Sequence, residues 1–128
     1  MILLLDTSIP EAKLTVVTEG VQQEVSWHAD RQLAKGLLDW MRRVLEEHDS
    51  TWQDITGIGV YRGPGSFTGL RIGIAVCNTL ADSLDVAIVG ETGDDWRDLA
   101  IDRLSAGETD RVVLPEYGSA ARITTPRK

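Results

Sequence analysis

The sequence predicts an α/β fold built on one mixed β-sheet. Short runs of apolar and β-branched residues, typical of strands, alternate along the chain with longer amphipathic stretches, typical of helices. The first three predicted strands follow one another directly, whereas a helix separates each later strand from the next. Strands joined through a helix run parallel, so we expect a parallel sheet with an antiparallel hairpin at one edge.

The predicted strands differ in how continuously apolar they are. Residues 2–5 form an unbroken apolar run, as expected for a strand that is buried on both faces. Glu19 and Gly20 form a tight turn between two runs rich in β-branched residues, so these two runs pair as a hairpin. The complete set of predicted strands is 2–5, 13–18, 21–27, 58–61, 86–89 and a short last strand at 112–114.

Three stretches have the length and periodicity of helices, and they comprise residues 33–48, 68–84 and 94–104. The resulting order of three strands, helix, strand, helix, strand, helix matches half of an actin-like or ribonuclease-H-like fold. We expect one such lobe over residues 1–110, followed by the short strand and a C-terminal tail in residues 111–128.

The first two predicted helices are more apolar than a surface helix requires. The apolar positions of the first span an arc of roughly 160°, against the roughly 100° that one buried stripe needs. The second has almost no polar face, so we expect something besides the sheet to cover it. Gly69, Gly73, Cys77 and Ala81 form a line of small residues along it, which either packs on the sheet or lets a partner helix approach.

Composition limits the classes of function. A length of 128 residues suits one domain, and a net charge of −7 argues against direct binding of nucleic acid, which favours a basic face. The single cysteine excludes an internal disulfide. The apolar run at the N-terminus meets Asp6 after five residues, too few for a signal peptide or a membrane span, so we expect a cytoplasmic protein without membrane contact.

The stretch VYRGPGSFTGLRIG, residues 60–73, is a glycine-rich turn that leads into the second helix. It lacks the lysine of a P-loop and the spacing of GxGxxG. Free N–H groups at the start of a helix favour anions, and Ser66 or Thr68 can cap this helix. The helix dipole disfavours a cation such as Arg71 near the first turn, which suggests an anionic partner for it, either Asp6 or a bound anion. The candidate anion or loop site is Asp6, Thr7, Gly63, Gly65, Ser66, Thr68, Gly69 and Arg71, and a stiff turn without ligand is the alternative.

No convincing catalytic set is present in the sequence. A metal-dependent nuclease of this fold needs several carboxylates at the strand ends, and only Asp6 is available. His28 and His48 lie in no metal-ligand spacing and are expected to be solvated or capping residues. We therefore expect no catalytic residue, no metal and no cofactor.

Two motifs resemble the TsaB (YeaZ) family. The opening ILLLDTS is followed, at about the family's usual distance, by GVYRGPGSFTGLRIGIAV. The GPGSFTGLRIG run is nearly diagnostic for the TsaB/TsaD superfamily, and its serine and phenylalanine favour TsaB. The resemblance covers residues 1–90, and the ending LPEYGSAAR is similar to a terminal P-x-Y-x-R pattern of the family.

This resemblance implies an actin-like, non-catalytic scaffold in bacterial synthesis of threonylcarbamoyladenosine in tRNA. Such a protein binds and stabilises TsaD, the pair recruits the ATPase TsaE, and tRNA is contacted only indirectly. The first two long helices form the interface with TsaD, or with a second copy when the protein is alone. The expected partner-binding residues are Leu38, Met41, Leu45, Leu70, Gly73, Ile74, Cys77 and Ala81. Whether a nucleotide binds at that interface is left open.

The chain departs from the family pattern in two respects. It passes from residues 94–104 almost directly to its end, which implies a minimal form with one lobe. Leu33 stands where the family often has a histidine. The HxxxH metal motif of TsaD is absent from the sequence, which excludes that catalytic relative. Two alternatives remain, an actin-like nucleotide-binding ATPase and a homodimeric interaction module unrelated to tRNA. Because actin-like ATPases bind nucleotide between two lobes, the first alternative is the weaker.

Overall fold

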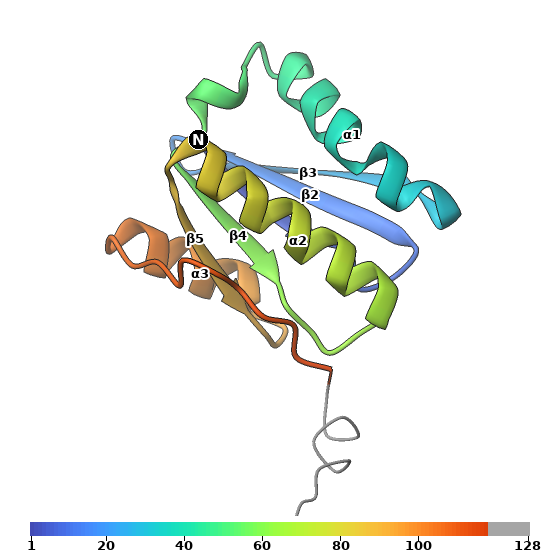
Figure 1. The fold of residues 1–128 in the computed structure, drawn as a ribbon. Coiled ribbons are helices and arrows are strands. Elements are labelled where there is room, and N and C mark those ends of the chain that lie inside the picture. The colour runs from blue at the N-terminus through green and yellow to red at the C-terminus, as the bar shows by residue number, and fades with distance from the viewer. Residues whose placement is uncertain (118–128) are drawn as a thin grey trace, which may run out of the picture.

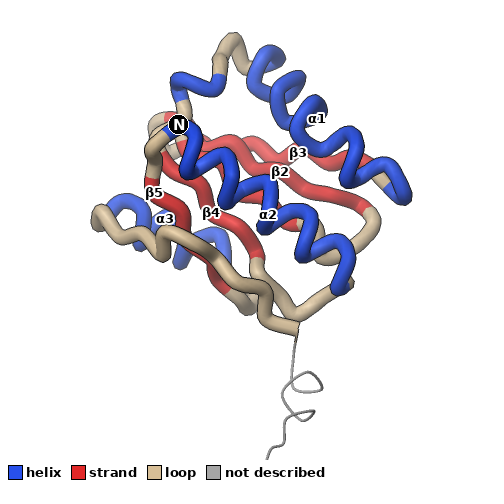
Figure 2. The backbone as a smooth tube through the Cα atoms, in the orientation of Figure 1, coloured by secondary structure: helices blue, strands red, loops and turns tan. Residues whose placement is uncertain are grey.

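A five-stranded mixed sheet with the order β3-β2-β1-β4-β5 organises the fold (Figures 1 and 2). The computed structural model describes residues 1–117. The strands are β1 (Ile2–Asp6), β2 (Glu11–Thr18), β3 (Val21–His28), β4 (Gly57–Tyr61) and β5 (Ala87–Glu91). The helices are α1 (Leu33–Glu47), α2 (Phe67–Leu84) and α3 (Trp96–Ser105), with 3₁₀ turns at Asp30–Gln32 and Trp52–Asp54. The predicted α/β half-fold and its element order are confirmed up to α3.

Strand β1 is the central strand of the sheet, with an antiparallel neighbour on one side and a parallel neighbour on the other. It runs antiparallel to β2, with Leu4 opposite Thr15, and parallel to β4, with Leu4 opposite Gly59. At the outer edge, Glu19 and Gly20 both have positive φ, at 51° and 79°. A two-residue turn of this kind matches the twist of a hairpin, so β2 and β3 pair as predicted.

Helices α1 and α2 lie on one face of the sheet and α3 lies on the other (Figure 1). Neighbouring residues of a strand point to opposite faces, so β1 contributes to both layers. Leu3 and Leu5 pack under α1 and α2, whereas Leu4 joins Val89 and the residues of α3. All three leucines are fully buried, which confirms the prediction for residues 2–5.

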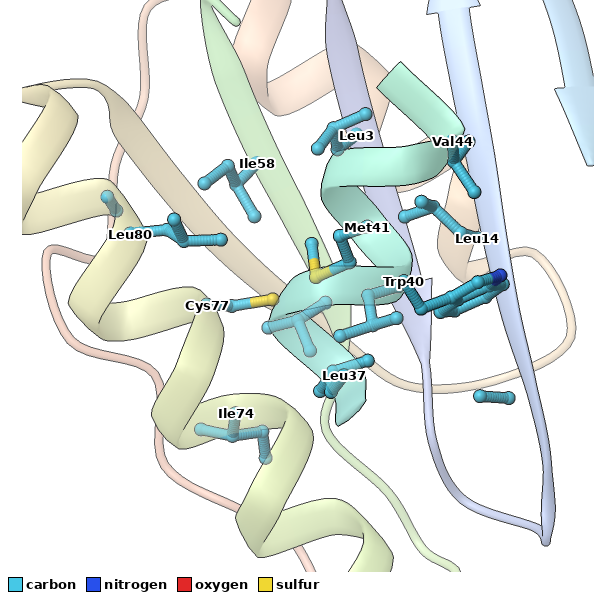
Figure 3. Packing of buried hydrophobic residues seen from close by; sticks show 14 of the residues in the cluster. Leu3, Leu14, Leu37, Trp40, Met41, Val44, Ile58, Ile74, Cys77 and Leu80 are labelled. Carbon is cyan, nitrogen blue, oxygen red and sulfur yellow. The ribbon is translucent and has the colours of Figure 1, made fainter. Parts of the chain in front are cut away.

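The larger core forms where the two helices meet above the sheet (Figure 3). Met41 of α1 and Cys77 of α2 point toward each other in this layer, and both are fully buried. At the β3 side of the same layer, the rings of Trp27 and Trp40 stack in a tilted arrangement with centroids 5.4 Å apart. The wide apolar arc of α1 is thus used by the sheet and by α2 together.

Helix α2 has an outward face that the sequence analysis missed. Arg71, Ala75, Thr79 and Asp82 are exposed and follow one another along this face. The apolar flanks of α2 are covered by α1 on one side and by Val113 and Tyr117 of the C-terminal segment on the other. Within residues 1–117 no helix is long and apolar enough to cross a membrane.

The predicted strand at 112–114 does not form. After α3 the chain turns at Gly107, which has a φ of 82°, and residues 108–117 return along the edge of β5 (Figure 1). Val113 is buried, whereas Val112 and Leu114 on either side of it are exposed. The burial of these three side chains therefore alternates as in a strand. The backbone of Val113 pairs with a side chain and not with a neighbouring strand, because the Asn78 amide bonds both its N–H and its carbonyl. The remaining residues of the predicted tail, 118–128, lie outside the described part of the chain.

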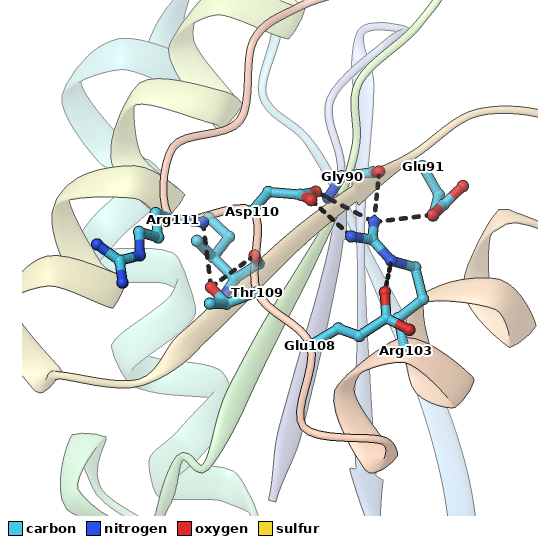
Figure 4. A network of polar contacts seen from close by, with 8 residues as sticks. Gly90, Glu91, Arg103, Glu108, Thr109, Asp110 and Arg111 are labelled. Atoms are coloured by element: carbon cyan, nitrogen blue, oxygen red, sulfur yellow. Dashed lines mark hydrogen bonds and ion pairs between the residues drawn. The ribbon is translucent and has the colours of Figure 1, made fainter.

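Arg103 of α3 ties the returning segment to the sheet (Figure 4). Its guanidinium donates to Glu108 at 2.8 Å, to Asp110 at 2.5 Å and to Glu91, at the end of β5, at 3.0 Å. The hydrogen bond from Arg103 lowers the pKa of Asp110 below its ordinary value of 3.8, and burial opposes this shift.

We predict that Asp110→Asn lowers the free energy of unfolding by about 1 kcal/mol at pH 7, because a charge-assisted bond is lost. Because the pKa of Asp110 is lower in the folded than in the unfolded chain, its carboxylate stabilises the fold at pH values above the ordinary pKa of 3.8. This stabilisation is lost as the pH falls through the folded-state pKa. Urea unfolding of the variant and the natural chain should thus give free energies of unfolding that differ less at pH 3 than at pH 7. Asp102→Asn, on the exposed surface of α3, is the control. Equal losses at both pH values would contradict the role of the Asp110 carboxylate.

Candidate partner-binding face and glycine loop

The glycine loop, residues 62–66, connects β4 to α2. The chain turns at the buried Gly63, whose φ of 126° is accessible to glycine and rarely to other residues. Ser66 is the N-cap of α2, since its Oγ accepts the N–H of Gly69 at 3.3 Å. Of the two predicted caps, Ser66 therefore has this role, and Thr68 is exposed in the first turn of the helix.

The glycines of α2 allow the helix to rest on the turn after β1. A side chain on Gly69 or Gly73 would overlap Thr7, and one on Gly65 would come within 2.5 Å of Ser8. The Thr7 hydroxyl is buried in this contact and donates to the Gly69 carbonyl at 2.6 Å. The backbone approach that the glycines permit is thus made to the chain itself.

Asp6 organises the same turn from the end of β1. Its Oδ1 accepts hydrogen bonds from the Ser8 N–H at 2.9 Å and from the Ser8 hydroxyl at 2.6 Å. Within residues 1–117 no ion pair joins Asp6 to Arg71, which is exposed on α2. The structure explains the loop as a packing device, and binding of an anion there stays a prediction.

The single cysteine and the two histidines lie in separate surroundings. Burial raises the pKa of the Cys77 thiol to about 12, so the thiol is protonated at neutral pH. His48 is the C-cap residue of α1, with Nδ1 2.8 Å from the Val44 carbonyl, and His28 is exposed, as predicted. Among residues 1–117 no three histidine, cysteine or acidic side chains gather as a metal site would require.

Burial changes which residues of α1 and α2 are available to a partner. Only Leu38 of the predicted set is exposed, at 50%. The other seven cannot contact a partner while the fold is intact, because the sheet, the neighbouring helix or Thr7 already covers them. These residues are Met41, Leu45, Leu70, Gly73, Ile74, Cys77 and Ala81. Of the two interpretations of the small-residue line, packing on the chain's own sheet is the one that the structure supports.

A different set of apolar residues lines the outside of the helix pair. A groove of about 940 Å³ lies between the starts of α1 and α2, with Ala34 on one side and Ile72 on the other. One helical turn further along, Leu38 and Val76 continue these two rows, since residues four apart share a helix face. We call Ala34, Leu38, Ile72 and Val76 the outer face.

Charged residues border the outer face on α1. Arg42 forms ion pairs with Asp39 at 2.6 Å and with Glu46 at 2.7 Å, and all three side chains are largely exposed. An apolar centre with a charged rim is the usual anatomy of a protein interface. Ile72 and Val76 could have been found from the sequence as the apolar residues at the margin of the α2 arc, where neither the sheet nor α1 covers them fully.

The fold and its paired helices define the class of protein to which the chain is related. Residues 11–92 match the family model described as TsaD, tRNA N6-adenosine threonylcarbamoyltransferase. The match runs from β2 to the end of β5 and so includes both helices of the outer face and the glycine loop.

Within this class the chain belongs to the TsaB (YeaZ) family. It is 31% identical, over 90 residues, to the tRNA threonylcarbamoyladenosine biosynthesis protein TsaB of Buchnera aphidicola subsp. Schizaphis graminum, covering 70% of this chain and 43% of that protein. It is 36% identical, over 74 residues, to the protein of the same name from Bacillus subtilis, covering 58% and 30% of the two chains. The structure of YeaZ from Pseudomonas aeruginosa matches with a TM-score of 0.66 at 32% identity, covering 71% and 43%. The chain thus spans less than half the length of each of these relatives.

We predict that Gly73→Leu lowers the free energy of unfolding by about 3 kcal/mol, because the new side chain overlaps Thr7. Ala75→Leu is the matched control, because it adds a leucine to the exposed face of the same helix, and we expect a change within about 0.5 kcal/mol. Thermal and urea unfolding of the two variants measure both effects. A Gly73→Leu protein as stable as the natural chain would show that this face of α2 is not packed on Thr7.

Proposed function

We propose that this chain is a non-catalytic scaffold subunit that binds and stabilises TsaD in the synthesis of threonylcarbamoyladenosine in tRNA. The outer face carries the proposal, because it is an apolar surface on two helices that also belong to the part matched by the family model. The relatives named as tRNA threonylcarbamoyladenosine biosynthesis proteins support the pathway. Since the chain spans less than half of their length, we assign it the scaffold role of this one lobe alone.

The chemistry of the described residues supports a role without catalysis. Asp6 uses its carboxylate to fix the turn after β1, and the Cys77 thiol is buried and protonated at neutral pH. The glycine loop carries no lysine that could hold a phosphate. These features favour an accessory subunit over a self-sufficient enzyme.

Partner binding through the outer face is consistent with the shape and charge of the chain. Leu38 is exposed and Ile72 and Val76 are only partly buried, so a partner can cover all three side chains, and burial of apolar side chains supplies much of the free energy of association. In the absence of TsaD, the same surface would pair with a second copy. With a net charge of −7, the chain is expected to reach tRNA only through TsaD, with TsaE joining the assembled complex in the cytoplasm.

We predict that Leu38→Asp weakens association with the host's TsaD by about thirtyfold, because a charge is placed in the apolar centre of the interface. The fold should be unaffected, since Leu38 is 50% exposed. Leu99→Asp is the matched control, because Leu99 is also partly exposed but lies on α3, across the sheet. Calorimetric titration of each variant with TsaD gives the affinities. Undiminished binding by Leu38→Asp, with Leu99→Asp as the weaker binder, would place the interface on the other face of the molecule.

The alternative from another class of function is an actin-like ATPase. We expect that the purified chain alone neither hydrolyses ATP nor cuts RNA, because the glycine loop has no phosphate-binding lysine and Asp6 is bonded to Ser8. Turnover is measured by phosphate release and by gel assay, with Asp6→Ala alongside. Activity that persists through purification and disappears in Asp6→Ala would overturn the scaffold role.

A further inference from the structure

Residues 108–117 form an extended strap that crosses from the edge of β5 to the glycine loop (Figure 1). The strap is attached to the rest of the chain at its beginning, middle and end. Each attachment consists of hydrogen bonds that involve backbone groups or side chains of the strap. At the second and third attachments, a glycine also leaves space for the strap.

The first attachment closes the exposed edge of β5. The Thr109 hydroxyl accepts the Ile88 N–H at 3.1 Å and donates to the Ile88 carbonyl at 3.2 Å, and this carbonyl also accepts the Asp110 N–H at 2.7 Å. The Asp110 carboxylate accepts the Gly90 N–H at 2.9 Å (Figure 4). The strap thus bonds backbone groups that an edge strand would leave open.

The second attachment is the middle of the strap, at Val113. The Asn78 amide donates to the Val113 carbonyl at 3.0 Å and accepts its N–H at 2.9 Å. The Val113 side chain is buried against Gly90, where any side chain would overlap it. Gly90 therefore provides the seat for Val113.

The third attachment is made to the glycine loop itself. The Glu116 N–H donates to the Arg62 carbonyl at 2.6 Å, and the Arg62 guanidinium donates to the Leu114 carbonyl at 3.3 Å. The Glu116 carbonyl lies where a side chain on Gly63 would stand. One residue further, the Tyr117 ring meets Phe67, the first residue of α2, edge to face with centroids 4.1 Å apart.

We propose that the strap clamps the glycine loop, so that the order of residues 62–66 depends on the strap being seated. The loop is held from two sides. On one side the Ser8 carbonyl accepts the Ser66 N–H at 3.0 Å, and on the other side lies the end of the strap. Release of the strap removes the second side. Of the hydrogen bonds that Arg62 forms within residues 1–117, the one from its N–H to the Glu91 carbonyl then remains. The start of α2 is thereby coupled to a segment more than forty residues away in the chain. This coupling does not depend on the proposed function.

The test is amide hydrogen exchange of the full chain, followed by mass spectrometry. Asn78→Ala removes the middle attachment without touching the loop, and we expect exchange to accelerate about tenfold both in residues 108–117 and in residues 62–67. The hairpin of β2 and β3 should keep its protection. Thr79→Ala is the matched control, because it removes a side-chain bond to Ala75 from the exposed face of the same helix.

Gly90→Val is a second variant, which displaces the strap even where the loss of one amide pair is tolerated. The new side chain overlaps Val113 and also comes within 2.9 Å of the flexible Arg62 side chain, so its informative result is exchange in residues 62–67 that stays unchanged. Faster exchange in residues 108–117 with unchanged exchange in residues 62–67, in either variant, would overturn the coupling. Unchanged exchange of the strap in both variants would overturn the attachments on which the coupling rests.

Discussion

The contact between Thr7 and the glycine face of α2 is the constraint on which the rest of the structure depends. Thr7 begins the turn after the central strand, and its buried hydroxyl donates to the Gly69 carbonyl at 2.6 Å. Because Gly73 also has no side chain, the helix axis can approach the sheet closely at this point. This approach fixes the rotation of α2, and with it which residues enter the core and which face outward.

The rotation of α2 has a direct bearing on function. It directs Ile74 and Cys77 into the layer shared with α1 (Figure 3). It leaves Ile72 at the groove between the two helices. An interface on this helix pair must therefore be built from the margin of the apolar arc rather than from its centre. That conclusion separates residues that stabilise the fold from residues that a partner can contact.

The fold was largely predictable, and the candidate site was not, for a physical reason in each case. The unbroken apolar run of β1 and the Glu19-Gly20 turn are local patterns, and local patterns predicted the strands and the hairpin. The apolar arc of α2 shows that the helix is covered, but it does not show whether sheet, helix or partner covers it. The set of interface residues that the sequence predicts therefore includes seven that the structure buries in the core. Residues 112–114 are a short apolar run, which is typical of a strand but does not show whether a ladder partner is within reach. In the structure the Asn78 amide bonds the backbone of Val113, and no local sequence pattern predicts a contact between a helix side chain and a backbone 35 residues away.

The turn at Gly107 gives the fold a natural graft point. Apart from Gly107 and its two neighbours, no atom of residues 1–117 lies within 4 Å of the position that a Cβ on Gly107 would take. The chain leaves α3 and joins the strap within three residues. Arg103 before the turn and Asp110 after it are bonded to each other, so the two ends of the turn stay together whatever lies between them. Additional polypeptide inserted here would leave and return at neighbouring points, and lengthening a surface loop costs little conformational free energy. A whole domain could thus be added to this lobe without disturbing the sheet, the glycine loop or the outer face.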